Sequence, residues 1–260
     1  MNTIEIKYYP LPLVPWQRSA KGTHPENWEE VTPAQLVAII KSFRGEIETN
    51  AFLHTMTGIS RRILSRLAPF HIYNLENLLS FFSDKKPYNT FIIKSITLSG
   101  KTFFAPQPKL KKMSFGQFIF ADTHFGNYNS KNEKSEASRF LSALYLPAKT
   151  GFSEDLIEQN AVFDKTSPVL LEAVIINYLL IKEWLVQIYP LVFDTDNDEK
   201  KLDKELKKPK APRDPMAWVK IFEILVGDDL INQDKWAEMP VHNIFRFMSK
   251  KIKENMKRKK

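Results

Sequence analysis

The feature that most constrains this chain is a long apolar stretch, SPVLLEAVIINYLLIKEWLVQIYP, at residues 167–190. Ser167 is suited to cap a helix, Pro168 fits a first helical turn, and Pro190 stops a helix about six turns later. Apolar residues cover nearly the whole circumference between them, which is typical of a helix buried in a protein or inserted in a membrane.

Three charged residues inside this stretch decide between the two environments. They are Glu172, Lys182 and Glu183. A charge at the centre of a bilayer costs about 3 kcal/mol, so these side chains oppose membrane insertion. We therefore expect residues 167–190 to form the central core helix of a mainly α protein, a multi-helix bundle that carries one small β-hairpin and an extended N-terminal arm.

Composition agrees with a folded protein in a reducing compartment. Of the 260 residues 43% are hydrophobic, with 19 Phe and 5 Trp, which is ample for a core. The chain has no Cys, so it can form neither a disulfide nor a thiolate zinc site. The N-terminal sequence lacks the cationic start and apolar run of a signal peptide. We expect a cytoplasmic protein, in the host cytoplasm if it is phage-encoded.

The pattern of the N-terminal half predicts an arm followed by helices. Residues 1–31 are punctuated by prolines, and Ile4 and Ile6 alternate as in a short strand. Thr32-Pro33-Ala34-Gln35 has the pattern of a capping box that begins a helix. A β-hairpin is predicted at about 90–105, where β-branched residues alternate around Ser99-Gly100.

Three further local predictions concern Asn74, residues 126–135 and Asp122. Asn74 is predicted to cap a helix, and residues 126–135 are predicted to form a polar loop. Asp122 falls on the apolar side of a helix that begins at Ser114, so we expect it to be partly buried and hydrogen-bonded to a neighbouring helix. Asp122 and His124 do not form an acid–base pair, because residues two apart on a helix point to different sides.

The composition changes abruptly after Phe193. Residues 194–214 are charged at most positions and nearly free of large apolar residues, which predicts a linker. Residues 1–193 are expected to form the helical body. Residues 215–260 are expected to form a two-helix module with a basic tail, too short to hold a core alone, so this module must dock on the body, a second copy or a partner.

The sequence lacks the usual catalytic signatures. It has no phosphate-binding G-x-x-x-x-G-K-[ST], dinucleotide-binding G-x-G-x-x-G, nucleophile-bearing G-x-S-x-G or zinc-binding H-E-x-x-H pattern. The five histidines are scattered, and the acidic residues of 194–205 lack the glycine that the sixth position of a calcium loop requires. We expect no cofactor, no metal and no enzymatic activity. An enzyme whose site is assembled from distant segments stays open as a second alternative.

Three segments together resemble a known class of protein. They are residues 113–160, which contain MSFGQFIFADTHFGNY and FLSALYLPAKTGFSEDLIEQN, the core helix with residues 191–193, and residues 216–248, MAWVKIFEILVGDDLINQDKWAEMPVHNIFRFM. This arrangement resembles the tail-assembly chaperone-like accessory proteins of tailed phages and prophages. The resemblance implies a non-enzymatic scaffold that binds the long helical tape-measure protein and helps tail-tube subunits to assemble around it.

Apolar stripes that meet an amphipathic helix are the expected mode of contact with such a partner. Aromatic anchors often carry much of the energy of an interface. The predicted contact residues are Trp218, Phe222, Leu225, Trp236, Phe245 and Met248. The alternative for these residues is that they pack the C-terminal module on its own body.

The net charge of +8 favours a different partner, nucleic acid. The residues that would serve this alternative are Arg61, Arg62, Arg66, Lys250, Lys251, Lys257 and Arg258. The terminal lysines have a simpler explanation, because cations are favourable at a helix C-terminus and keep a protein soluble. The oligomeric state and the identity of the partner are not determined by the sequence.

Overall fold

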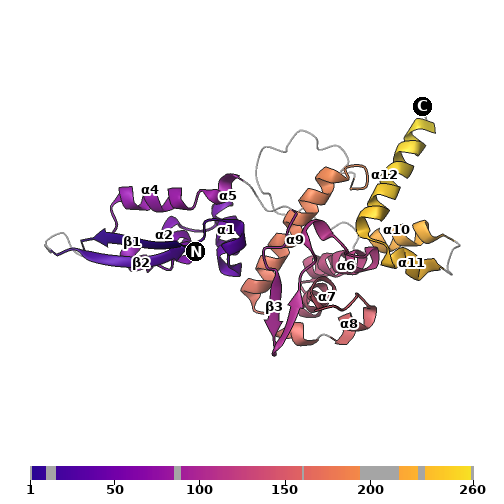
Figure 1. Cartoon of the computed structure of the whole chain (residues 1–260), viewed down its shortest axis with the longest axis horizontal. Helices are drawn as coiled ribbons and strands as arrows, with labels where there is room; N and C mark the ends of the chain where they lie inside the picture. The colour runs from indigo at the N-terminus through magenta and orange to yellow at the C-terminus, as the bar shows by residue number, and fades with distance from the viewer. Residues whose placement is uncertain are drawn as a thin grey trace. The chain divides into compact units, whose positions relative to one another are not determined.

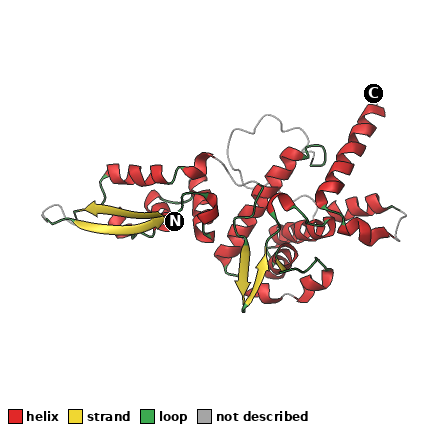
Figure 2. Ribbon diagram, in the orientation of Figure 1, coloured by secondary structure: helices red, strands yellow, loops and turns green. Residues whose placement is uncertain are grey.

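A computed structural model of the chain describes residues 2–9, 16–84, 89–159, 161–193, 217–227 and 232–258. Helices dominate it, with two small antiparallel sheets (Figure 2), so the predicted mainly α class is confirmed. Two compact units are present, residues 1–87 with 172–176, and residues 88–171 with 177–260. Each unit is described by itself below.

The first unit combines a β-hairpin with short helices (Figure 1). Its elements are β1 (Asn2–Tyr8), β2 (Arg18–His24), the 3-10 helix η1 (Trp28–Glu30), α1 (Pro33–Phe43), α2 (Thr49–Thr57), α3 (Arg61–Leu64), α4 (Pro69–Leu78) and α5 (Phe81–Asp84). The predicted arm, residues 1–31, thus contains both strands of a hairpin. Strand β2 pairs with β1 in the register Ile4↔Gly22 and Ile6↔Ala20.

Local sequence explains how this unit is held together. Ile4, Ile6 and Ala20 are buried, so the alternation of β1 turns its apolar side to the core. The predicted capping box before α1 is present: the Gln35 amide donates to Thr32 Oγ1 at 3.3 Å, and the Thr32 amide donates to Gln35 Oε1 at 2.9 Å.

One helix of this unit begins earlier than the sequence predicts. Asn74 is not a cap, because α4 begins at Pro69 and Asn74 lies inside it. Pro69 occupies the first turn, where the missing amide hydrogen of proline costs nothing. Asn74 is exposed, so its side chain interferes little with helical packing.

The second unit is a layered helical assembly with a small sheet. Its elements are β3 (Ser95–Leu98), β4 (Lys101–Phe104), η2 (Pro108–Leu110), α6 (Phe115–Lys131), α7 (Lys134–Leu144), β5 (Leu146–Pro147), α8 (Glu154–Gln159), η3 (Ala161–Lys165), α9 (Pro168–Ile188, apart from residues 172–176), α10 (Ala217–Val226), α11 (Gln233–Glu238) and α12 (Val241–Arg258). The hairpin predicted around Ser99-Gly100 is formed by β3 and β4, and β5 adds a third strand beside β4.

The predicted polar loop at 126–135 is wrong over most of its length, since 126–131 belong to α6 and 134–135 belong to α7. Helix α6 continues through Lys131, and Asn132 then ends it in a left-handed conformation, φ 55°. Asparagine tolerates this conformation, which is why the chain turns there. At the start of α6 one half of a capping box forms: Ser114 Oγ accepts from the Gln117 amide at 3.1 Å, while the Gln117 side chain donates to the Ala143 carbonyl of α7 at 2.9 Å.

The core helix is confirmed as α9, with Ser167 as its cap, accepting from the Leu170 amide at 3.3 Å. Its middle is buried: Tyr178 and Leu185 have no exposed surface. Asn177 is buried as well, and it is satisfied by accepting from the Ile92 amide at 2.6 Å and donating to the Thr90 carbonyl at 3.1 Å.

The C-terminal helices belong to the same compact unit as α6 and α7. The linker predicted at 194–214 lies outside the described residues. Among the helices that the structure describes, none has the length and apolar character needed to cross a membrane.

Candidate partner-binding surface on the C-terminal helices

The C-terminal helices α10 to α12 are seated on α6 by an aromatic cluster. Phe245 of α12 has no exposed surface and Trp218 of α10 is only 8% exposed. The Trp218 ring meets the rings of Phe118 and Phe193 at centroid distances of 5.2 and 5.4 Å, and Phe245 meets Phe118 at 5.3 Å. Edge-on packing of this kind is worth about 0.5–1.5 kcal/mol per pair beyond the burial of area.

Backbone hydrogen bonds fix the segment between α11 and α12 to the start of α6. The Phe115 amide donates to the Met239 carbonyl at 2.8 Å, and the Val241 amide donates to the Met113 carbonyl at 2.9 Å. Gly116 allows this approach, because a Cβ there would lie 3.3 Å from the Cβ of Ala237. These contacts set the direction in which α12 leaves the body.

The six predicted contact residues divide into two groups. Trp218 and Phe245 are buried in the cluster on α6, so they serve the packing of the module on its own unit, the alternative that the sequence left open. The other four are half-buried: Phe222, Leu225, Trp236 and Met248. Trp236 packs against Phe247 at a centroid distance of 5.9 Å.

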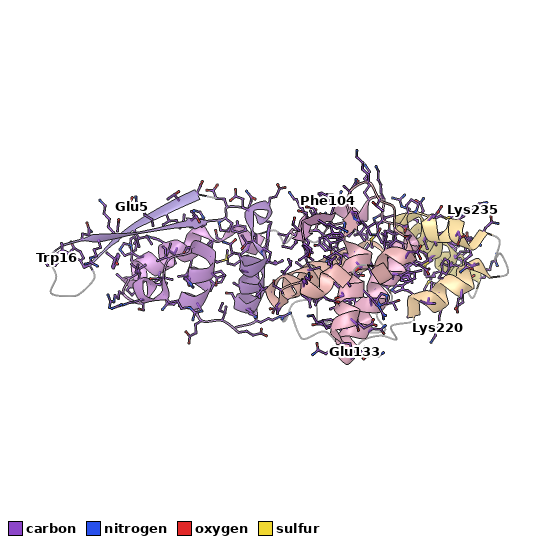
Figure 3. The ribbon with its side chains drawn as sticks, turned by 90° about the horizontal axis from the view of Figure 1, so that it is seen from below. Glu5, Trp16, Phe104, Glu133, Lys220 and Lys235 are labelled. Atoms are coloured by element: carbon purple, nitrogen blue, oxygen red, sulfur yellow. The ribbon has the colours of Figure 1, made fainter. Side chains whose placement is uncertain are left out.

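Large apolar side chains nevertheless remain exposed on these helices. Ile224 of α10 is 78% exposed, Met256 of α12 is 50% exposed and Phe247 is 39% exposed. Figure 3 shows Lys220 and Lys235 at the surface of α10 and α11, so exposed charged side chains accompany the exposed apolar ones. The helices therefore present a mixed surface, which is typical of protein interfaces.

The apolar stripe of α12 continues beyond the part of the helix that the rest of the unit covers. Val241 and Ile244 are buried, Met248 and Ile252 are half-buried, and Met256 is half exposed. The C-terminal half of α12 extends beyond α6, α10 and α11 in Figure 1. The apolar residues recur at spacings of three and four. The stripe is therefore buried at its N-terminal end and exposed at its C-terminal end.

A row of cations follows a second side of α12. Arg246, Lys250, Lys253 and Lys257 succeed one another at spacings of four, three and four residues, which places them on one side of a helix. The sequence predictions included Lys250 and Lys257 but not Arg246 and Lys253. The spacing itself is a signal that could have found them.

This row borders a groove. Residues at the end of α9 form its other wall, and its volume is about 550 Å³. The lining residues are Ile188, Tyr189, Pro190, Leu191, Arg246, Ser249, Lys250, Lys253, Glu254 and Lys257. Of these described residues one is acidic, Glu254, and it lies 4.0 Å from the ammonium groups of Lys250 and Lys251.

A second hollow of about 300 Å³ adjoins the groove. It shares Ile188, Tyr189 and Arg246 with the groove and adds Pro108, Lys109, Lys111, Trp184 and His242. His242 is fixed at its base: its Nε2 lies 2.5 Å from the Lys109 carbonyl oxygen and its Nδ1 lies 2.8 Å from the Tyr189 hydroxyl. Because a carbonyl only accepts, Nε2 carries the hydrogen and Tyr189 donates to Nδ1.

The predicted environment of Asp122 is confirmed. Its Oδ1 accepts from the Tyr178 hydroxyl at 2.9 Å and lies 2.6 Å from the Lys182 ammonium, both on α9. Burial, with the Asp122 charge and hydrogen bond adding to it, raises the pKa of Tyr178 well above its usual value, so this hydroxyl stays protonated and donates. The network joins α6 to α9 and uses Lys182, one of the three charges that argued against a membrane helix.

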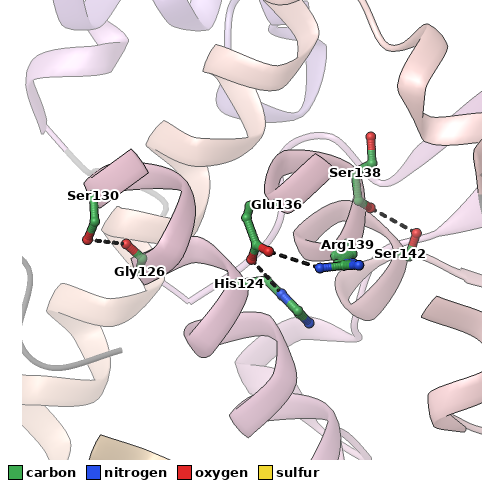
Figure 4. Close-up of polar contacts among 7 residues, drawn as sticks. All are labelled: His124, Gly126, Ser130, Glu136, Ser138, Arg139 and Ser142. Carbon is green, nitrogen blue, oxygen red and sulfur yellow. Dashed lines mark hydrogen bonds and ion pairs between the residues drawn. The ribbon is translucent and has the colours of Figure 1, made fainter. Parts of the chain in front are cut away.

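His124 is paired with Glu136 of α7, not with Asp122. Its Nδ1 lies 2.8 Å from Glu136 Oε2, and Arg139 lies 3.0 Å from Glu136 Oε1 (Figure 4). Burial would raise the pKa of Glu136, but hydrogen bonds from His124 and Asn127 and the charges of His124 and Arg139 outweigh it and lower this pKa. The carboxylate is therefore ionised and fixes α6 to α7.

The remaining basic candidates belong to two different units. Arg61 and Arg62 are exposed on α3, and Arg66 is exposed in the turn that follows it, all in the first unit. Lys250, Lys251, Lys257 and Arg258 are exposed on α12 in the second unit. Over the described part of the chain, no group of three or more His, Asp or Glu side chains is placed to hold a metal ion.

Comparison with known proteins gives no relative from which a function could be transferred. No protein-family model, curated protein sequence or solved structure matches the chain.

Proposed function

We propose that the chain is a non-enzymatic assembly or interaction protein that binds a helical protein partner through its C-terminal helices. The closest model for this role is a tail-assembly chaperone-like protein bound to a tape-measure-like protein, which the sequence resemblance implies. The site geometry supports the general role, partner binding, and the resemblance supports the particular partner.

The observation that carries the proposal is the incomplete burial of the α12 stripe. Val241 and Ile244 are covered by the body, while Ile252 is half-buried and Met256 is 50% exposed. Exposed apolar side chains that continue a helical stripe offer a partner helix the same contacts that the body offers to the first turns. Transfer of apolar surface from water contributes about 25 cal/mol per Å², so two such side chains add materially to affinity.

Buried aromatic residues of α10 and α12 keep this surface ordered. Phe245 and Trp218 hold the helices on α6, so a partner meets an ordered surface and does not have to fold it. Preorganisation of this kind raises affinity because less conformational entropy is lost on binding.

The test is co-expression of the full chain with a long helical tape-measure-like protein, followed by size-exclusion chromatography. We expect the two to elute together and the soluble fraction of the helical protein to rise. Ile252→Gln with Met256→Gln is expected to abolish co-elution. Asn243→Gln, an exposed polar change on the same helix, serves as the matched control and is expected to bind normally.

Two results would contradict the proposal. One is a chain that never alters the solubility or elution of the helical protein. The other is an Ile252 and Met256 double variant that remains folded and binds as the control does.

A further inference from the structure

The groove between the end of α9 and α12 is the larger of the two hollows described above, and its two walls differ in charge. The row Arg246, Lys250, Lys253, Lys257 supplies four cations on one side. The row runs from Arg246 to Lys257, a length of about 16 Å at the helical rise. Helical recognition elements of about three turns have this length.

The opposite wall is apolar. Ile188 is 41% exposed at the last residue of α9, and Leu191 is half-buried just beyond it. Pro190 lies between them and is exposed. A ligand in this groove therefore meets aliphatic side chains on one side and ammonium or guanidinium groups on the other.

The two walls are fixed to each other. Tyr189 donates to His242 at 2.8 Å and its ring packs on Phe245 at a centroid distance of 5.3 Å, so the end of α9 is joined to the first turns of α12. Since Tyr189 is only 9% exposed, its ring is engaged in these contacts and offers little face to a ligand.

From these observations we infer that the groove binds an acidic amphipathic helix of a protein partner. Carboxylates spaced four, three and four residues apart on such a helix would face the cation row, and its apolar side would cover Ile188 and Leu191. This inference rests on the proposed function. It adds to the contact at Ile252 and Met256 a second binding surface, the groove, and gives the charge of the partner.

The walls of the groove favour this occupant over nucleic acid. A cation row alone would serve phosphates equally well. Single-stranded nucleic acids, however, bind by stacking bases on open aromatic faces. The one aromatic residue in the wall opposite the cations, Tyr189, is only 9% exposed, and Ile188, Pro190 and Leu191 make up the rest of that wall. A duplex backbone gains nothing from aliphatic side chains, whereas a partner helix buries them.

Binding of synthetic peptides to the full chain, followed by fluorescence anisotropy, tests this inference. The probe is a labelled helical peptide with glutamates at the four-three-four spacing and leucines on the adjoining side, and its control has glutamine at every glutamate. We expect the glutamate peptide to bind at least about tenfold more tightly than the glutamine peptide, because like-sized polar side chains leave the cations without countercharge.

Variants locate the binding. The double variant Arg246→Glu with Lys253→Glu is expected to lower the affinity for the glutamate peptide by about tenfold or more, since two attractive contacts become repulsive. Lys101→Glu with Lys134→Glu changes the net charge equally at exposed positions outside the groove and is expected to bind normally. Ile188→Ser removes apolar surface without changing the charge, and it is also expected to lower the affinity for the glutamate peptide.

Several outcomes would overturn the inference. These are equal binding of the two peptides, equal binding by the Arg246 and Lys253 variant and its charge-matched control, or tighter binding of a DNA duplex that displaces the peptide. A circular dichroism spectrum identical to that of the parent chain shows that the variants are folded. If the groove variant still co-elutes with the tape-measure-like protein, the groove inference fails while the proposed function stands.

Discussion

The Tyr189 hydroxyl at the end of α9 donates a hydrogen bond to His242 Nδ1 in the first turns of α12, at 2.8 Å. The other nitrogen of His242 faces the Lys109 carbonyl oxygen at 2.5 Å, so a single imidazole joins three segments that are far apart in the sequence. Both contacts lie beside the groove, and they hold α12 at a fixed distance from α9.

Removing this hydroxyl tests its structural role. We expect Tyr189→Phe to lower the free energy of unfolding by about 1 kcal/mol, the usual net value of a hydrogen bond, because the ring packing is kept. Urea denaturation of the full chain measures this loss. Tyr73→Phe, at a 61% exposed position on α4, is the matched control and should change nothing.

The aromatic cluster predicts a larger effect. Phe245→Ala should lower the free energy of unfolding of this unit by about 3–5 kcal/mol, because a fully buried ring leaves a cavity among Phe115, Phe118 and Trp218. Phe247→Ala, two residues along the same helix and 39% exposed, should cost much less. Similar losses for both variants would show that the cluster does not hold α12 in place.

The Asp122–Lys182 pair predicts a penalty for leaving one charge alone. We expect Asp122→Asn to cost about 2 kcal/mol, within the range for hydrogen bonds to charged groups, because Lys182 and Tyr178 lose an anionic acceptor. Combining it with Lys182→Met should cost less than the sum of the two single changes. Thermal or urea unfolding of the four proteins gives the coupling, and strictly additive losses would argue against the pair.

Glu136 predicts a dependence of stability on pH. Its pKa is lowered in the folded chain from an ordinary value of 4.5, so the folded state binds the proton less readily than the unfolded state. The stabilisation is therefore complete above about pH 4.5 and is lost as the pH falls through the lower folded-state pKa. Glu136→Gln should flatten this part of the stability profile, as measured by urea denaturation from neutral to acid pH. Glu133→Gln, at an exposed position nearby, should leave the profile unchanged.

Parts of the fold with strong local signals could be predicted from the sequence. Ser167 and Pro190 enclose α9, and Ser99-Gly100 marks the turn between β3 and β4. Strand β2 could not be predicted, because Arg18–His24 lacks alternating β-branched residues and its pairing with β1 is a tertiary contact. Helix α6 was expected to end too early, since Gly126, Asn127 and Asn129 are poor helix formers that tertiary packing overrides.

The candidate site was predictable only in part. The side of α12 that carries Arg246 and Lys253 can be read from their spacing, and the stripe through Ile252 and Met256 can be read in the same way. The facing wall cannot, because Ile188 and Leu191 come from a segment that meets α12 only through the tertiary fold. The burial of individual side chains is also known only from the structure. The sequence pattern alone does not distinguish Phe245, which is buried, from Phe247, which is 39% exposed.

Hydrogen–deuterium exchange of the full chain with and without the glutamate peptide tests the central claim most directly. We expect slower amide exchange in residues 246–257 of α12 and at residues 188–191, with no change at the arginines of α3. Slower exchange confined to residues 61–66, or none at either end of the groove, would contradict the claim that this protein acts through the surface of its C-terminal helices.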